Sequence, residues 1–125
     1  SERTILDKDK VMQGVTAVMN DTSKGIYWVA KTNGKPIGSL MITKEWSDWN
    51  NSWYWWIQSV YVTPEHRGKG VFKRMYNKVI ELARSENISQ VRLYVDKNNL
   101  TAQHVYEKLG MKECHYYMYE TNTKV

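Results

Sequence analysis

The sequence contains a single cysteine, Cys114, among its 125 residues. One cysteine excludes an internal disulfide and fits a reducing, cytoplasmic setting. No apolar run reaches the length of a membrane span, and the N-terminus lacks a signal-peptide pattern, so no membrane partner is expected. Cys114 is expected to be a buried or edge-strand residue, because no neighbouring side chain makes a convincing pair with it.

The sequence also lacks repeats, low-complexity segments and linkers, and its length suits one domain with a hydrophobic core. The histidines and Cys114 show no metal-ligand spacing, so no metal is expected. A net charge of +5 suits a polyanionic ligand. The basic residues are dispersed and the aromatic residues lie beside acids, so nucleic-acid binding is the least favoured class.

Hydrophobic periodicity predicts an α+β fold: antiparallel hairpins first, then a parallel β-α-β crossover with flanking helices. Asn33-Gly34 between two strands suits a type I′ hairpin turn. The predicted helices cover 8–20, 71–85 and a short segment after residue 99, and the predicted strands cover 26–32, 37–44, 53–62, 91–95 and 115–119.

A basic, glycine-rich loop leads from a strand into the amphipathic helix that begins at Val71. The first turn of a helix has unpaired N–H groups and the positive end of the helix dipole. Gly68 and Gly70 let a phosphate approach closely, and Arg67 and Lys69 add positive charge. This order predicts a site for a phosphorylated ligand. The alternative is an ordinary strand-to-helix turn, since neither a Walker loop nor a G-x-G-x-x-G fingerprint is present.

A second motif lies about thirty residues downstream, on a short helix capped by Asn98 or Asn99 and stopped by a glycine. With both motifs, the chain resembles the GNAT superfamily of N-acetyltransferases over roughly residues 26 to 120. The family's acetyl-CoA loop, R-x-x-G-x-G/A, is matched by Arg67 and Gly70. The family's later helix, N-x-x-A-x-x-x-Y-x-x-x-G-F/M, is matched by Asn99, Ala102, Tyr106, Gly110 and Met111.

The resemblance implies a GNAT-like mixed sheet, acetyl-CoA as co-substrate and acetyl transfer to an amine. It places the cofactor on a loop of six residues: Arg67, Gly68, Lys69, Gly70, Val71 and Phe72. Phe72 departs from the pattern, because the family has a small residue there. We expect its ring to turn toward the core beside Tyr76, which would leave its N–H available. GNAT domains also begin with a strand and a helix that have no counterpart before Lys8, so the chain looks short at its N-terminus.

The resemblance gives Tyr106 the role of general acid toward the CoA sulfur. A phenol has a pKa near ~10 and holds its proton at neutral pH. The alternative is that Tyr106 only packs against Ala102. The family binds pantetheine along the strand before the loop, here Val60, Tyr61 and Val62, where an N–H would stabilise the oxyanion. Asn99 either contacts the pantetheine arm or only caps its helix.

Five of the six tryptophans fall between Trp46 and Trp56, beside the carboxylates Glu45 and Asp48. A loop of this composition could hold a cationic acceptor, with Glu45 or Asp48 relaying its proton through water. Trp55 and Trp56 are expected instead to lie in the core or on a stacking surface of the sheet. Gln58 and Ser59 are further candidates for acceptor contacts.

The sequence as a whole predicts one GNAT-like domain over residues 1–125 that transfers acetyl from acetyl-CoA to a primary amine of a small molecule or a protein. Direct transfer is expected, since no nucleophile for a covalent intermediate is evident. The alternative is a non-catalytic acyl-CoA-binding or regulatory module with the same fold. A homodimer is possible through the aromatic surface.

Overall fold

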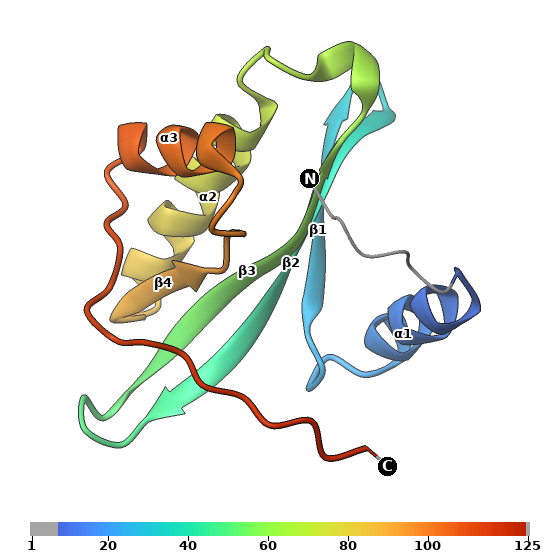
Figure 1. Cartoon of the computed structure of the whole chain (residues 1–125). Helices are drawn as coiled ribbons and strands as arrows, with labels where there is room; N and C mark the ends of the chain where they lie inside the picture. The colour runs from blue at the N-terminus through green and yellow to red at the C-terminus, as the bar shows by residue number, and fades with distance from the viewer. Residues whose placement is uncertain (1–7, 125) are drawn as a thin grey trace. The chain divides into compact units, whose positions relative to one another are not determined.

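The protein is described by a computed structural model in which residues 8–124 are placed (Figure 1). The chain divides after Tyr94 into two compact units, and each is described by itself. The first unit contains α1 (Lys8–Asn20), β1 (Ile26–Thr32), β2 (Lys35–Ser47), β3 (Ser52–Val62), a 3-10 turn (Pro64–His66), α2 (Val71–Ser85) and β4 (Gln90–Leu93). The second contains α3 (Leu100–Lys108).

The four strands form one mixed sheet in the order β1-β2-β3-β4. β1 to β3 are antiparallel, and β4 returns parallel to β3 after α2, as predicted. The turn between β1 and β2 has positive φ at both Asn33 (51°) and Gly34 (77°), which confirms the type I′ geometry. β2 is longer at both ends than expected, because the ladder with β3 continues to the pair Ser47–Ser52.

Most of the core of the first unit lies between α2 and one face of the sheet, whereas Tyr54 is buried on the other face beside the Arg92 guanidinium. The buried apolar side chains are Ile37, Leu40, Ile42, Tyr54, Trp55, Ile57, Val71, Met75, Tyr76, Val79 and Ala83. The helix members recur three or four positions apart, which is the apolar stripe that the sequence predicts for this helix. The stripe holds the first turn of α2 beside the end of β3, where the candidate site lies.

α1 begins and ends as predicted, but none of its residues is buried. Its apolar stripe stays open to solvent, with Met12 and Met19 well exposed. None of the helices within residues 8–124 is long and apolar enough to cross a membrane.

The predicted final strand at 115–119 is wrong, because residues 111–124 form no helix or strand. Tyr116, Tyr117 and Tyr119 have the β-propensity of a strand, but a strand exists only where a neighbour pairs with it. Cys114 is exposed and lies outside any strand, which corrects the prediction of a buried or edge-strand residue. β4 also ends two residues earlier than predicted, at Leu93.

Gly38 on β2 allows α2 to pack closely on the sheet. A Cβ atom placed there would lie 3.0 Å from Val71 Cγ1 and 3.1 Å from the backbone oxygen of Tyr61. We expect Gly38→Ala to lower the free energy of unfolding by about 1–3 kcal/mol, measured by urea denaturation, because the β3 backbone cannot yield. Gly14→Ala is the control: it fills open space within α1 and is expected to stabilise by up to about 1 kcal/mol. Equal stability of Gly38→Ala and wild type would contradict the close packing.

Candidate functional site

A single 3-10 turn redirects the chain from β3 toward α2. Within it His66 N donates to Thr63 O at 2.9 Å and Arg67 N donates to Pro64 O at 3.3 Å. The Thr63 hydroxyl and His66 Nδ1 lie 2.9 Å apart in a second hydrogen bond. His66 therefore holds the turn together, and the loop that follows starts from a fixed point.

The loop ends in a cluster of backbone N–H groups at the start of α2. Gly68 and Gly70 have φ of 73° and 78°, and a Cβ atom placed on either would meet nothing within 4 Å. The bond from Arg74 N to Gly70 O (3.1 Å) opens the helical pattern. Among residues 8–124 the N–H groups of Val71 and Lys73 have no hydrogen-bond acceptor. Open space, N–H groups without an acceptor and the positive end of the helix dipole make the start of α2 a candidate anion site.

Basic side chains surround this anion site. Arg67 Nε donates to Val62 O at 2.9 Å, and its guanidinium lies 5.6 Å from the centre of the Tyr61 ring. Lys69 and Lys73 are exposed and form no ion pair with the described carboxylates. Two lysine charges thus remain available to a phosphorylated ligand.

Phe72 is turned away from the open side of the loop. Its ring lies beside Tyr76, one turn along α2, with 6.1 Å between ring centres, and is half-buried. The expected orientation is confirmed, so the bulky side chain does not fill the space beside Gly68 and Gly70.

β3 loses its neighbour on one side before it reaches the loop. The parallel ladder ends at the pair Ile57–Leu93, whereas β3 continues to Val62. Just beyond that pair, Ser59 has a φ of 52°, and the register with β2 shifts at this point, which marks a β-bulge. A non-glycine residue held at positive φ is a strained feature of the kind found at functional sites.

The free side of β3 presents backbone groups to solvent. Thr63 N donates to Ile37 O at 2.9 Å, on the β2 side. Because successive N–H groups point to opposite sides of a strand, Val62 and Val60 direct theirs to the open side. The hydrogen bond from Arg67 to Val62 O lies on that same side. An extended ligand could therefore pair with Val60 to Val62 and reach the anion site at its other end.

The second unit contains the helix that carries the later motif. Asn99 caps α3, since its side-chain oxygen accepts a hydrogen bond from Ala102 N at 3.1 Å. Gly110, with a φ of 96°, ends it: Gly110 N donates to Glu107 O at 3.0 Å and Met111 N to Tyr106 O at 3.1 Å. These two bonds form a Schellman motif. Helix termination therefore accounts for the asparagine and the glycine of the motif.

Helix termination does not account for the tyrosine of the motif, Tyr106. The ring is half-buried, and burial raises the pKa of its hydroxyl above the ordinary tyrosine value. A raised pKa keeps the phenol protonated, which a proton donor requires.

The tryptophan-rich segment lies mostly in strands, and the loop predicted at 45–52 is shorter than expected because β2 continues to Ser47. Only residues 48–51 form the turn between β2 and β3. Trp46 and Trp53 face each other across the two strands in an edge-to-face pair at 5.2 Å. Trp49, at the turn, is 95% exposed.

Trp55 lies in the core and Trp56 on a stacking surface of the sheet, the two environments that the sequence predicts for them. Trp55 is buried and packs edge-to-face on Trp28 of β1 at 6.4 Å. Trp56 stacks on Tyr94 with 4.6 Å between ring centres. Neither ring forms an open cage for a cation.

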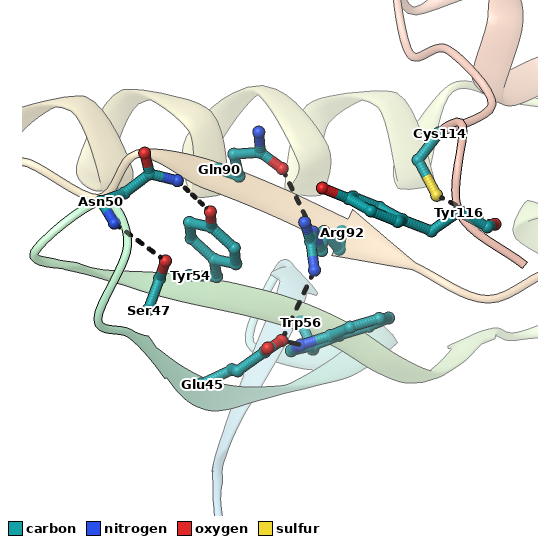
Figure 2. A network of polar contacts seen from close by, with 9 residues as sticks. All are labelled: Glu45, Ser47, Asn50, Tyr54, Trp56, Gln90, Arg92, Cys114 and Tyr116. Atoms are coloured by element: carbon teal, nitrogen blue, oxygen red, sulfur yellow. Dashed lines mark hydrogen bonds and ion pairs between the residues drawn. The ribbon is translucent and has the colours of Figure 1, made fainter. Parts of the chain in front are cut away.

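Glu45 lies on β2 and forms a charged network with β3 and β4 (Figure 2). Trp56 Nε1 donates to Glu45 Oε1 at 2.7 Å, and Arg92 Nη1 lies 3.6 Å from the same oxygen. The Arg92 guanidinium stacks on the Tyr54 ring at 4.4 Å, and its Nε donates to Gln90 Oε1 at 3.1 Å. Glu45 and Arg92 thus form an ion pair on one face of the sheet.

Asp48 is separated from this network. It lies in the turn, where its backbone oxygen accepts from Asn51 N at 3.3 Å, and its side chain is exposed. The turn is held by Asn50, whose backbone N donates to Ser47 Oγ at 3.2 Å and whose side chain contacts the Tyr54 hydroxyl. Glu45 therefore belongs to the charged network and Asp48 does not, although the sequence analysis assigns both carboxylates the same candidate role.

Gln58 continues the polar face beyond Trp56. Its Nε2 donates to Thr43 Oγ1 at 2.7 Å, across the β2–β3 ladder. Among residues 8–124 no group of three histidine, cysteine, aspartate or glutamate side chains could hold a metal ion.

Arg92 is the residue that sequence reasoning missed. The available signal was alternation: Gln90 and Arg92 are polar, whereas Val91 and Leu93 between and after them are apolar. Period-two alternation predicts that Arg92 faces the side of the sheet opposite the core of Val91 and Leu93. Its pairing with Glu45 depends on the β2–β3–β4 order, which alternation does not give.

The sequence profile of the Acetyltransferase (GNAT) family matches residues 5–111. An uncharacterized N-acetyltransferase of Methanocaldococcus jannaschii is 32% identical over 88 residues, covering 70% of this chain and 39% of that protein. A thialysine N-epsilon-acetyltransferase of Sus scrofa is 33% identical over 85 residues, covering 64% of this chain and 49% of that protein.

The crystal structure of a possible acetyltransferase from Clostridium difficile 630 superposes with a TM-score of 0.91 at 43% identity, covering 98% of this chain and 81% of that one. This agreement confirms the predicted GNAT-like mixed sheet. The chain spans less than half the length of the two curated relatives described above. Because the family profile covers most of the chain, the protein belongs to the acetyltransferase (GNAT) family.

Proposed function

We propose that the protein transfers the acetyl group of acetyl-CoA directly to a primary amine. The observation that carries this proposal is the continuity of two features: the open side of β3 at Val60–Val62 leads into the anion site at the start of α2. Acetyl-CoA has matching parts in the same order, an extended pantetheine arm followed by a pyrophosphate.

The residues fit this ligand well. The pyrophosphate would accept hydrogen bonds from the N–H groups around Gly68 to Val71, and Lys69 and Arg67 would add charge. The pantetheine amides would pair with the backbone of Val60, Tyr61 and Val62, as an added strand does. Arg67 would release Val62 O to make this pairing.

The chemistry has three requirements. The neutral amine attacks the thioester carbon, so a C–N bond forms, and the oxyanion takes a hydrogen bond from the N–H of Val60 or Val62. The C–S bond then breaks, and Tyr106 gives its proton to the CoA thiolate. The amine proton leaves through water to solvent, with Glu45 or Asp48 as candidates for the relay. One molecule of CoA is released for each amide formed, and because no covalent intermediate is involved, CoA is released only when an amine is present.

The acceptor is a small amine. The Sus scrofa relative is named for acetylation of an ε-amine, and Glu45 is a carboxylate on the polar face of β2 and β3 that could attract an ammonium group. Asn99 serves as a helix cap in this proposal, because its side chain is already used.

The test is titration calorimetry with acetyl-CoA, CoA and ATP, followed by an assay for free CoA thiol with a panel of primary amines. We expect acetyl-CoA and CoA to bind more tightly than ATP, and thiol release to depend on the amine. Folded protein that binds no CoA species would disprove the proposal. Binding without thiol release for any amine would favour the non-catalytic module.

A further inference from the structure

The side chain of Arg67 lies on the open side of β3. Its Nε donates to Val62 O at 2.9 Å, five residues back along the chain. Val62 is opposite Gly38 on β2, and the next residue, Thr63, directs its N–H to that strand. Because neighbouring residues of a strand direct their backbone groups to opposite sides, Val62 O points away from β2. The arginine therefore occupies an acceptor beyond the end of the β3–β4 ladder, which stops at Leu93.

Two further contacts hold Arg67 in this position. Its backbone N donates to Pro64 O at 3.3 Å, at the end of the 3-10 turn. Its guanidinium lies 5.6 Å from the centre of the Tyr61 ring, within the range of a cation–π contact. Tyr61 directly precedes Val62 on β3, so both side-chain contacts of the arginine are to the end of that strand. We call the Arg67 side chain with its contacts to Val62 O and the Tyr61 ring the Arg67 strap.

The Arg67 strap occupies the position that a pantetheine arm would need. An arm that pairs with β3 as an added strand would run about 4.8 Å from it, and an amide nitrogen of the arm would lie about 2.9 Å from Val62 O. Arg67 Nε is already at 2.9 Å from this oxygen. Because the two donors compete for one position, the arm can pair with Val62 only after the arginine has moved away.

A phosphate at the candidate anion site would draw the arginine away from Val62. The residues of that site, Gly68 to Val71, follow Arg67 directly in the sequence, and the space beside the two glycines is open. A hydrogen bond from a guanidinium to a phosphate joins two opposite charges, so it is stronger than a bond from the same group to a neutral carbonyl oxygen. The phosphate is therefore the preferred partner of Arg67, and Val62 O is its partner in the free protein.

We propose that Arg67 makes binding of the pantetheine arm depend on binding of the phosphates. In the free protein the Arg67 strap covers Val62 O, which disfavours thioesters that carry only the arm. A bound phosphate attracts the guanidinium and opens the strand for pairing, so the protein selects complete CoA thioesters over shorter acyl thioesters. This inference rests on the proposed binding of acetyl-CoA and makes Arg67 a specificity-determining residue for the acyl donor.

Two acyl donors that differ only in the phosphate-bearing part test the proposal. Acetyl-CoA carries the phosphates, and S-acetylpantetheine has the same arm and thioester without them. In Arg67→Met we expect kcat/KM for S-acetylpantetheine to rise about three- to tenfold, because the arm no longer displaces the strap. For acetyl-CoA we expect kcat/KM to fall about three- to tenfold, because the phosphates lose a charged partner. If the protein binds both donors without turnover, their dissociation constants are expected to change in the same two directions.

Calorimetric titration with ADP, which carries a pyrophosphate and no arm, measures the phosphate contact by itself. We expect Arg67→Met to bind ADP about three- to tenfold more weakly than the wild type. Arg84→Met is the matched control, because Arg84 is an exposed arginine in the last turn of α2. At ~1.5 Å of rise per residue it lies on the order of 20 Å along the helix from Val71. Its variant should match the wild type with all three ligands.

A gain with the shorter donor is a result that a general loss of structure would not give. If Arg67→Met does not fold, Arg67→Gln removes the charge but keeps a polar side chain, and it is expected to show the same two opposite changes. S-acetylpantetheine used no better by the folded variant than by the wild type would overturn the proposal. Unchanged affinity for ADP would overturn the dependence on the phosphates. A folded wild type that binds no CoA species would instead disprove the proposed function itself.

Discussion

Replacing Gly70 by glutamate is expected to weaken acetyl-CoA binding by about a hundredfold or more, equivalent to ~2.7 kcal/mol. The new side chain would start in open space beside the N–H groups at the start of α2, where we place the pyrophosphate. A carboxylate there would occupy the anion site and repel the phosphates. Calorimetric titration with acetyl-CoA measures the loss directly.

Backbone strain alone could also weaken binding, so the control must share it. Gly34→Glu is matched, because Gly34 has a φ of 77° against 78° for Gly70, and a Cβ atom on either meets nothing within 4 Å. In both variants a glutamate at positive φ is therefore expected to destabilise the fold by about 1–2 kcal/mol. Gly34 lies in the β1–β2 turn, and its variant should bind acetyl-CoA as the wild type does. Equal affinity of the Gly70 and Gly34 variants would place the phosphates elsewhere.

Local sequence signals predicted the elements that local interactions decide. The bounds of α2 follow from its apolar stripe and the glycine before it, and the β1–β2 turn follows from Asn33-Gly34. The segment at 115–119 has the residue types of a strand, but pairing decides a strand and no local pattern supplies the partner. The bulge at Ser59 was also beyond prediction, since serine has no special preference for positive φ.

The candidate site likewise contains one part that local sequence signals indicate and one part that depends on strand order. The loop geometry of the candidate anion site follows from residues that are contiguous in sequence, the glycines, the basic residues and the helix start, and its role in binding phosphate stays a prediction. The ion pair of Glu45 and Arg92 could not be predicted, because the two residues are 47 positions apart in sequence and meet only through the strand order β2-β3-β4. Composition alone indicated that Glu45 or Asp48, beside the tryptophans, could hold a cationic acceptor. The ion pair with Arg92 lowers the net charge at Glu45, which the local sequence does not reveal.

Tyr106→Phe is expected to lower kcat about a hundredfold while leaving the affinity for acetyl-CoA unchanged. Removing a general acid costs a factor of this order, and the ring itself is retained. Burial raises the pKa of Tyr106, so its phenol stays protonated at pH values where an ordinary tyrosine begins to ionise near ~10. In the wild type, ionisation of Tyr106 should therefore lower the rate only above this pH, and the variant should lack that decline. A pH–rate profile with a saturating amine measures both effects.

Tyr76→Phe is the control for Tyr106→Phe, because it also removes a buried tyrosine hydroxyl but one that has no part in the proposed reaction. Burial also raises the pKa of Tyr76, but its ring packs within α2 beside Phe72 and has no place in the proposed proton transfer. Its variant should keep the wild-type kcat and the decline at high pH. If Tyr106→Phe behaves as Tyr76→Phe does, water protonates the departing thiolate and Tyr106 serves only to pack α3. If only Tyr106→Phe slows the reaction, the hydroxyl that the motif places on this helix is the proton donor.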